Sequence, residues 1–356
     1  MKFLFLFIFI SCVNAQMVIH SSFHNATSES GPEIITKTIG SGGDYTTIED
    51  WFDAYVDTNL ITRDIILKGV LLDANYNIYS EQFNLNPPTN ADSSHYYWLV
   101  GDGSSKLNLS GNSYDGMLGG NCDVRIEGVE FDGNDYDIDF PSIDLVNISS
   151  GRHYFEIKNC YFHDIDVDYH YGEGTGAFGI SIANGTATVY NNIIYNVGPN
   201  DHEMSRVLKA ITINSHNANI YNNTISTIGS GTYNMYTYGI FIDNDYSPAG
   251  IILRNNIVLD CNAMDGYDTL CYYYDGVTPI ASNNGSEDET APGSSSLTSL
   301  GSVLVNPAGG NFNLGVGSNP IDAGYNLGSF YAIDFAGNTR GSYGPWDMGA
   351  LECTTP

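Results

Sequence analysis

Two short runs of the sequence alternate aspartate with apolar or aromatic residues, a pattern that suits cation binding. They read Asp135-Tyr136-Asp137-Ile138-Asp139-Phe140 and Asp164-Ile165-Asp166-Val167-Asp168-Tyr169. In a strand, this alternation places the carboxylates of a run on one face. Stacked carboxylates are hard oxygen ligands, so we expect a Ca²⁺ site formed by Asp135, Asp137, Asp166 and Asp168. The alternative is a solvated acidic face that binds no metal.

A basic group follows the acidic runs. Segment 201–209 places His202, Arg206 and Lys209 close together in the chain. A uronate-cleaving lyase needs a cation to neutralise the substrate carboxylate and a base to remove the adjacent proton. We therefore predict His202, Arg206 and Lys209 as catalytic candidates, with Ca²⁺ as the cofactor. The alternative for the basic residues is surface pairing with Asp201 and Glu203.

Tyrosines are frequent downstream of the basic group. Aromatic rings on the wall of a groove stack on sugar rings, while carboxylates and amides bind the hydroxyl groups. The sequence therefore predicts an extracellular polysaccharide as the partner. A glycoside hydrolase stays possible beside a lyase, because the acidic residues offer many candidate carboxylate pairs. The predicted substrate-binding residues are Tyr233, Tyr236, Tyr238 and Tyr273.

A repeat of constant length must position these side chains. Gly128, Asn159, Asn191, Asn222 and Asn255 stand at equivalent places, separated by 31, 32, 31 and 33 residues. A fixed period of this length is typical of a solenoid. Side chains about one period apart then become neighbours on the surface, which would align Asp135 with Asp166.

Within each repeat, apolar and polar residues alternate on both sides of the landmark residue, which is strand patterning. A second strand precedes several repeats, at Gly179–Ile182, Ala210–Ile213 and Gly239–Ile242. Earlier strands are expected at 64–70 and 96–101, and residues 281–299 are expected to form a surface loop. We predict an all-β fold, a right-handed parallel β-helix with an N-terminal capping helix. A β-sandwich with regular turns is the alternative.

Composition limits the functions that the chain can have. The 41 acidic and 12 basic residues give a net charge of −29, which disfavours nucleic acid and anionic membranes as partners. An anionic polymer would need metal ions or a local basic cluster. Cys261 and Cys271 flank a short loop and are the expected disulfide in an oxidising compartment, whereas no cysteine spacing indicates a zinc site.

The N-terminal sequence predicts that the protein is exported. Residues 1–15 contain one Lys and an apolar run too short to span a bilayer, which is typical of a signal peptide. A secreted, extracellular protein without a membrane span follows. Residues 16–36 form a lead-in and 37–353 the β-helix domain, with an N-terminal cap at 37–60 and a closing segment at 300–353. A helix over 44–56, capped by Thr47 with Asp50 three residues later, should cover the first coil.

Residues at both ends resemble a known family. The opening Thr38-Ile39-Gly40-Ser41-Gly42-Gly43-Asp44-Tyr45-Thr46-Thr47-Ile48 and the closing motifs Asn319–Gly324, Asp334–Gly341 and Asp347–Glu352 are similar to those of secreted right-handed parallel β-helix proteins of the pectate-lyase-like superfamily. The resemblance implies the fold and a carbohydrate-active function. However, the chain lacks the Asn-Thr-Asp, Gly-His-Gly and Arg-Ile-Lys motifs of polygalacturonases and the Trp-Ile-Asp-His and Arg-x-Pro-x-x-Arg motifs of pectate lyases.

Two functions therefore stand side by side. The first is a secreted β-helix that binds, and in the enzymatic version cleaves, a polysaccharide with the help of Ca²⁺. The second is a non-catalytic adhesin, spike or fibre protein, for which the many tyrosines and an odd number of cysteines in the mature chain leave room for self-assembly.

Overall fold

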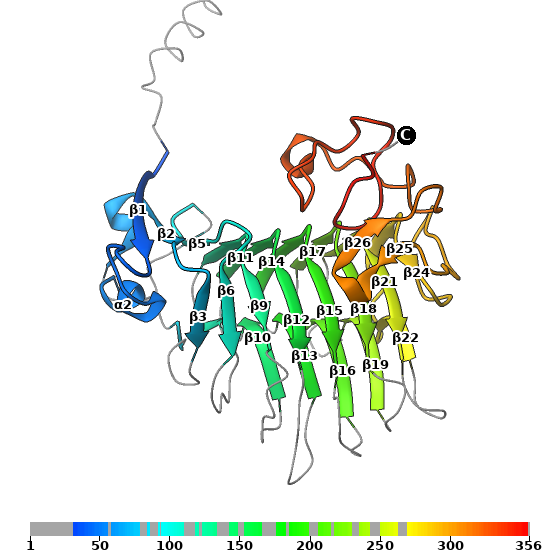
Figure 1. Ribbon diagram of the computed structural model, residues 1–356, viewed down its shortest axis with the longest axis horizontal. Coiled ribbons are helices and arrows are strands. Elements are labelled where there is room, and N and C mark those ends of the chain that lie inside the picture. The colour runs from blue at the N-terminus through cyan, green and yellow to red at the C-terminus, as the bar shows by residue number, and fades with distance from the viewer. Residues whose placement is uncertain are drawn as a thin grey trace, which may run out of the picture. The chain divides into compact units, whose positions relative to one another are not determined.

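Three parallel sheets share the chain, and successive strands enter the sheets in turn. The computed structural model describes residues 31–55, 58–78, 84–85, 92, 94–109, 118–120, 123–133, 142–148, 153–165, 176–182, 185–198, 206–214, 217–229, 235–242, 250–262 and 269–354. Neighbouring strands of a sheet are one coil apart in sequence and lie side by side in chain order (Figure 1). The predicted all-β parallel β-helix is confirmed.

The sheets are named A, B and C. Sheet A contains β1 (Glu33–Ile39), β2 (Ile65–Leu71), β5 (Tyr97–Val100), β8 (Val124–Glu127), β11 (His153–Lys158), β14 (Gly185–Tyr190), β17 (Asn217–Tyr221), β20 (Gly250–Arg254) and β23 (Ile280–Ser282). Sheet B contains β3 (Asn75–Ile78), β6 (Lys106–Leu109), β9 (Glu130–Asp132), β12 (Tyr161–Ile165), β15 (Ile193–Val197), β18 (Thr224–Ile228), β21 (Ile257–Cys261) and β24 (Gly285–Ser286). Sheet C contains β4 (Asn84–Leu85), β7 (Leu118–Gly120), β10 (Ser142–Ile148), β13 (Gly176–Ile182), β16 (Arg206–Ile213), β19 (Met235–Ile242) and β22 (Thr269–Tyr274).

The turn from sheet A into sheet B explains the repeat. Its landmark residues all have left-handed backbone conformations, with φ between 52° and 65°. Glycine and asparagine adopt this region more readily than other residues, so the sequence shows one or the other at these five turns. These residues are Gly128, Asn159, Asn191, Asn222 and Asn255.

The residue after the landmark forms the hydrogen-bonded asparagine column. Asn192 Nδ2 donates to Asn223 Oδ1 at 3.0 Å, and Asn223 Nδ2 donates to Asn256 Oδ1 at 2.9 Å. Asn256 Nδ2 continues the column to Asn284 Oδ1 at 3.1 Å. All four side chains are fully buried. The column therefore stands one residue later than the landmark residues that define the repeat.

Asn284 also corrects the expectation of a surface loop over 281–299. β23 and β24 lie in this segment, and Asn284, Gly285 and Ser286 are buried, so its first half is the final coil. The coil was hidden in the sequence because its strands are very short and its Asn stands 28 residues after Asn256, below the usual period.

The predicted capping helix is present in shorter form. α2 (Ile48–Asp53) begins after Thr47, whose hydroxyl accepts a hydrogen bond from Asp50 N at 3.0 Å. Trp51 is fully buried, and its ring lies 6.0 Å from that of Tyr97 in β5. The helix thus covers apolar side chains of the first coils, as a solenoid end requires. A single turn, α3 (Leu60–Arg63), leads into β2.

Residues Ile34 to Pro356 form one compact unit. Its main core consists of apolar side chains that stack coil on coil, such as Phe131 on Phe162 with ring centroids 4.5 Å apart. After the last coil, the closing segment adds the antiparallel pair β25 (Leu304–Asn306) and β26 (Asn311–Leu314) and the 3₁₀ turns η1 (Pro307–Gly309) and η2 (Ser329–Tyr331). Among the described residues, no helix has the length and apolar character of a membrane span.

Candidate functional site

An aromatic surface lies on the outer face of sheet C. Phe241 in β19 pairs in register with Tyr273 in β22, and their rings stack with centroids 5.0 Å apart and 16° between the planes. Tyr238 completes the group, with its ring 5.1 Å from each of the other two. Lys209 in β16 pairs with Tyr238 and places its Nζ 3.6 Å from the centroid of Phe241. We call these four residues the sheet C platform.

The ladder of sheet C passes over one residue at the same place in neighbouring strands, and in β19 this irregularity brings Tyr238 and Phe241 to the same side. The register runs from Tyr238–Leu270 to Ile240–Tyr272 and passes over Gly239. A Cβ atom at Gly239 would lie 2.7 Å from the carbonyl oxygen of Cys271 and would overlap Val258, so the position requires glycine. Both rings therefore belong to the aromatic surface although they are three residues apart in β19.

The platform combines flat rings with a positive charge. Phe241 and Tyr273 are partly exposed, whereas Tyr238 is only 7 % exposed and anchors the group in the sheet. Tyr236, two residues before Tyr238 and therefore on the same face, is 40 % exposed. Rings of this kind pack against the apolar face of a sugar, and an ammonium group attracts a carboxylate. The arrangement suits a sugar that carries an acid group.

The structure brings four of the predicted site residues to this one face, namely Lys209, Tyr236, Tyr238 and Tyr273. Arg206 opens β16 opposite Met235, and its side chain is outside the described part. The predicted residues that lie outside the described residues are Asp135, Asp137, Asp166, Asp168, His202 and Tyr233.

Phe241 was not predicted as a site residue. The sequence could have indicated it, because the two preceding coils carry the polar residues Ser181 and Thr212 at the outward position that Phe241 occupies. An aromatic residue in an otherwise polar column has no core to fill. It is therefore a candidate for contact with a ligand.

A polar cluster occupies the outer face of sheet B. Glu130, Asp132 and His163 bring potential metal-ligating atoms within 4.8 Å of one another. However, Lys106 Nζ lies 2.7 Å from Glu130 Oε1 and 2.8 Å from Asp132 Oδ2. His163 Nε2 lies 2.9 Å from the same Glu130 oxygen. The lysine ammonium takes the place that a metal ion would fill, so we interpret this cluster as structural.

The outer face of sheet A carries a ladder of charges. Glu156 is 1 % exposed and lies between Arg125, at 3.8 Å from its Nε, and Lys158, at 3.6 Å from its Nζ. Tyr190 and Tyr331 border this ladder, with ring centroids 4.9 Å apart. Burial raises the pKa of both phenols, that of Tyr331 to about 12, so at neutral pH both hydroxyls stay protonated. The ladder therefore offers no phenolate base.

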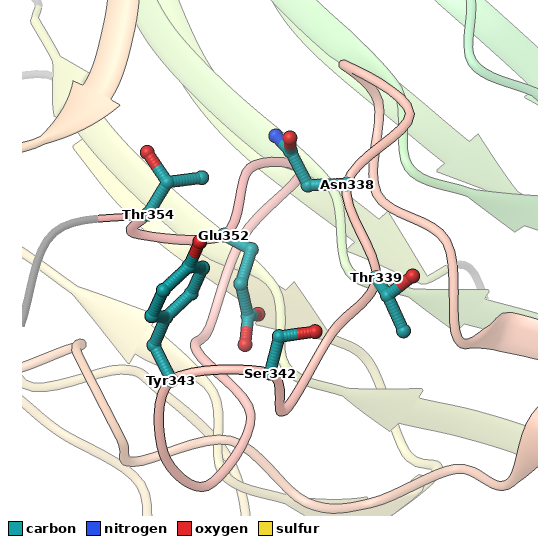
Figure 2. Close-up of a pocket in the computed structure, with 6 residues that line it drawn as sticks. All are labelled: Asn338, Thr339, Ser342, Tyr343, Glu352 and Thr354. Carbon is teal, nitrogen blue, oxygen red and sulfur yellow. The ribbon is translucent and has the colours of Figure 1, made fainter.

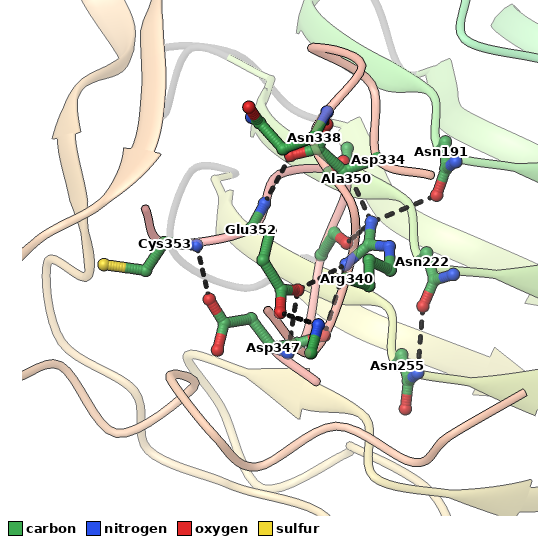
Figure 3. A network of polar contacts seen from close by, with 12 residues as sticks. Asn191, Asn222, Asn255, Asp334, Asn338, Arg340, Asp347, Ala350, Glu352 and Cys353 are labelled. Atoms are coloured by element: carbon green, nitrogen blue, oxygen red, sulfur yellow. Dashed lines mark hydrogen bonds and ion pairs between the residues drawn. The ribbon is translucent and has the colours of Figure 1, made fainter. Parts of the chain in front are cut away.

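A polar network fixes the closing segment against the coils (Figure 3). The side chain of Arg340 is fully buried and donates through Nη2 to Asn191 Oδ1 at 3.0 Å and to the carbonyl oxygens of Gly349 and Ala350, both at 2.9 Å. Its Nη1 lies 3.3 Å from Glu352 Oε2. The closing motifs that resemble those of the pectate-lyase-like superfamily thus have a structural function in this chain.

A pocket of about 300 Å³ adjoins this network and is shown in Figure 2. Among the described residues that line it, only Glu352 carries a charge, and its carboxylate already accepts hydrogen bonds from Gly341 N at 2.7 Å and Asp347 N at 3.2 Å. The carboxylate therefore serves the closing segment, and we assign no function to the pocket. Its lining residues are Asn338, Thr339, Ser342, Tyr343, Glu352 and Thr354.

The expected disulfide is not formed in the structure. Cys160, Cys261 and Cys271 are free thiols. Cys261 ends β21 and Cys271 lies in β22, so the pair faces each other across the interior where sheets B and C meet. Their sulfur atoms lie within 4.8 Å of each other but not at bonding distance.

Comparison with known proteins does not assign the chain to a family. No family model matches the sequence. No curated protein matches it significantly either.

Proposed function

We propose that the protein is a secreted, pectate-lyase-like β-helix that binds an acidic polysaccharide on the sheet C platform. The observation that carries the proposal is the stacked pair Phe241–Tyr273 with Lys209 beside it. Strands of one sheet lie about 4.8 Å apart, so the platform presents its rings along the stacking direction of the coils. An extended sugar chain running across neighbouring coils would contact several of these side chains at once.

The net charge of −29 limits where an acidic polysaccharide can bind. A polyanion would be repelled by most of the surface, so its binding needs local cations. Lys209 supplies one cation at the platform. Ca²⁺ bound to Asp135, Asp137, Asp166 and Asp168 would supply another. Two observations support this second part: Asp132 pairs with His163, 31 residues apart, and the same offset relates Asp135 to Asp166.

Cleavage is the enzymatic version of the proposal. His202, Arg206 or Lys209 would then remove the proton next to a uronate carboxylate that Ca²⁺ or a basic side chain neutralises. The platform geometry supports binding without requiring cleavage. Incubation with uronate polymers decides between the two, because a lyase releases ultraviolet-absorbing unsaturated products and a hydrolase releases new reducing ends. Binding without either product would identify a non-catalytic surface protein.

The variant Tyr273→Ala tests the platform. Losing one stacked ring should raise the dissociation constant for a polyuronate about 10-fold, because a stacking contact contributes about 1.4 kcal/mol. Isothermal titration calorimetry with polyuronate and with a neutral glucan would measure it. Tyr274→Ala is the matched control, since Tyr274 is 40 % exposed in the same strand but outside the platform. Equal affinity in wild type and Tyr273→Ala would refute the platform as the binding site.

Calcium titration tests the acidic runs. If the four aspartates bind Ca²⁺, its addition at 100 times the dissociation constant should raise the free energy of unfolding by about 2.7 kcal/mol. The gain should disappear in the double variant Asp166→Ala/Asp168→Ala. Mg²⁺ is the control ion, because it demands a smaller octahedral site. A thermal shift that is identical in wild type and variant would place the ion elsewhere.

A further inference from the structure

The final coil brings together two thiols and a carboxylate. Cys261 Sγ, Cys271 Sγ and a carboxylate oxygen of Glu287 all lie within 4.8 Å of one another. Cys261 is 6 % exposed and Cys271 is fully buried. We propose that these three residues form a binding site for a thiolate-preferring divalent metal ion of the Zn²⁺ type. The site is separate from the sheet C platform and independent of the proposed glycan function.

The ligand set fits zinc in type and spacing. Zinc binds thiolate sulfur at about 2.3 Å and carboxylate oxygen at about 2.0–2.2 Å, which places ligands of a tetrahedral site roughly 3.3–3.8 Å apart. The atoms present are within reach of that spacing after a small inward movement. A calcium site is disfavoured here, because two of the three ligands are sulfur.

The loop that carries the carboxylate is attached to both cysteine strands. Glu287 Oε1 accepts a hydrogen bond from Cys261 N at 2.6 Å, and Asp288 Oδ2 accepts one from Cys271 N at 2.8 Å. Asp288 Oδ1 is in turn held by the Thr290 hydroxyl at 2.6 Å. These bonds hold the loop, and with it the Glu287 carboxylate, against the two cysteine strands, as hydrogen-bond partners orient ligands in metal sites.

The contrast with the sheet B cluster supports the proposal. In that cluster, Lys106 forms ion pairs with the carboxylates of Glu130 and Asp132 and occupies the place of a metal ion. In the described part of the chain, no Lys, Arg or His forms an ion pair with Glu287. Metal binding would release one proton from each thiol to solvent, giving two thiolates and one carboxylate around the ion with a fourth position for water. The net charge of the site then stays the same, because two bound positive charges replace two protons.

Sequence reasoning missed this site because its ligands have no recognisable spacing. The cysteines stand ten residues apart in strands of different sheets, and Glu287 follows sixteen residues later in the final coil. Their proximity results from the stacking of the coils.

The test uses the full-length protein, reduced and freed of metal. Co²⁺ addition should produce a thiolate-to-cobalt charge-transfer band that saturates at one equivalent, and Zn²⁺ should displace the Co²⁺ and abolish the band. Cys261→Ser should lose the band. Glu287→Gln, which keeps both thiols and the shape of the loop, should weaken binding about 10- to 100-fold. Cys160→Ser is the matched control, because Cys160 is fully buried but outside the site.

Two results would overturn the proposal. The first is the absence of the band when thiol titration of the denatured protein shows Cys261 and Cys271 to be reduced. The second is a purified native protein in which mass analysis finds these cysteines joined as a disulfide, since the oxidised pair cannot bind the ion.

Discussion

Replacing Arg340 with methionine should lower the free energy of unfolding by about 3–5 kcal/mol, the usual cost of removing one partner from a buried ion network. The guanidinium faces Glu352 at 3.3 Å, and it also donates to Asn191 in the turn of a central coil. Its loss leaves the buried carboxylates of Asp347 and Glu352 without their cation. The closing segment would also lose a direct bond to the coils.

Urea unfolding of wild type and Arg340→Met measures this effect. Arg63→Met is the control, because Arg63 is exposed at the end of α3 and also loses one positive charge. The double variant Arg340→Met/Glu352→Gln should lose less stability than the sum of the single variants, since the unpaired charge is removed as well. A loss below about 1 kcal/mol for Arg340→Met would show that the network contributes little to stability.

Asn256→Ala should cost about 3 kcal/mol or more, because it interrupts the middle of the asparagine column. Asn256 Oδ1 accepts hydrogen bonds from both Asn223 N, at 3.2 Å, and Asn223 Nδ2, at 2.9 Å, and its own Nδ2 donates to Ile220 O at 2.8 Å. These groups are buried, so removing the amide leaves several of them unsatisfied, at about 1–3 kcal/mol each.

Thermal or urea unfolding of Asn256→Ala and of Asn77→Ala would separate this effect from a general cost of losing asparagine. Asn77 lies exposed in β3, where its amide is accessible to water, and its replacement should change stability by less than about 0.5 kcal/mol. Similar losses in the two variants would mean that the column is not a major source of stability.

The period of the sequence was sufficient to predict the fold. Left-handed turns select Asn or Gly at one position per coil, and this constraint survives in a single sequence because few other residues satisfy it. The cap of α2 was predictable for a similar reason, since Thr47 and Asp50 interact locally. The repeat period predicted that side chains such as Lys209, Tyr238 and Tyr273 would become neighbours, but it did not show that they lie in strands of one sheet.

Features that depend on contacts between coils could not be predicted in the same way. Lys106 neutralises carboxylates 24 and 26 residues later, and nothing in either segment alone indicates the pairing. The final coil escaped detection because its strands are short. Gly239 was expected to lie in a regular strand, but the ladder passes over it, as it also passes over Ala210 in the preceding coil.

The asparagine column stabilises the interior of successive coils in the same way, whereas the outer faces of the sheets vary from coil to coil, and this difference has an evolutionary consequence. Because each coil repeats the same turn, duplication of a unit of about 31 residues would lengthen the protein without breaking the hydrogen bonds of its neighbours. Outward side chains can then diversify coil by coil. Repeated duplication and mutation could therefore give related chains longer or chemically different recognition surfaces. The asparagine column and the apolar core would stay under the same selection.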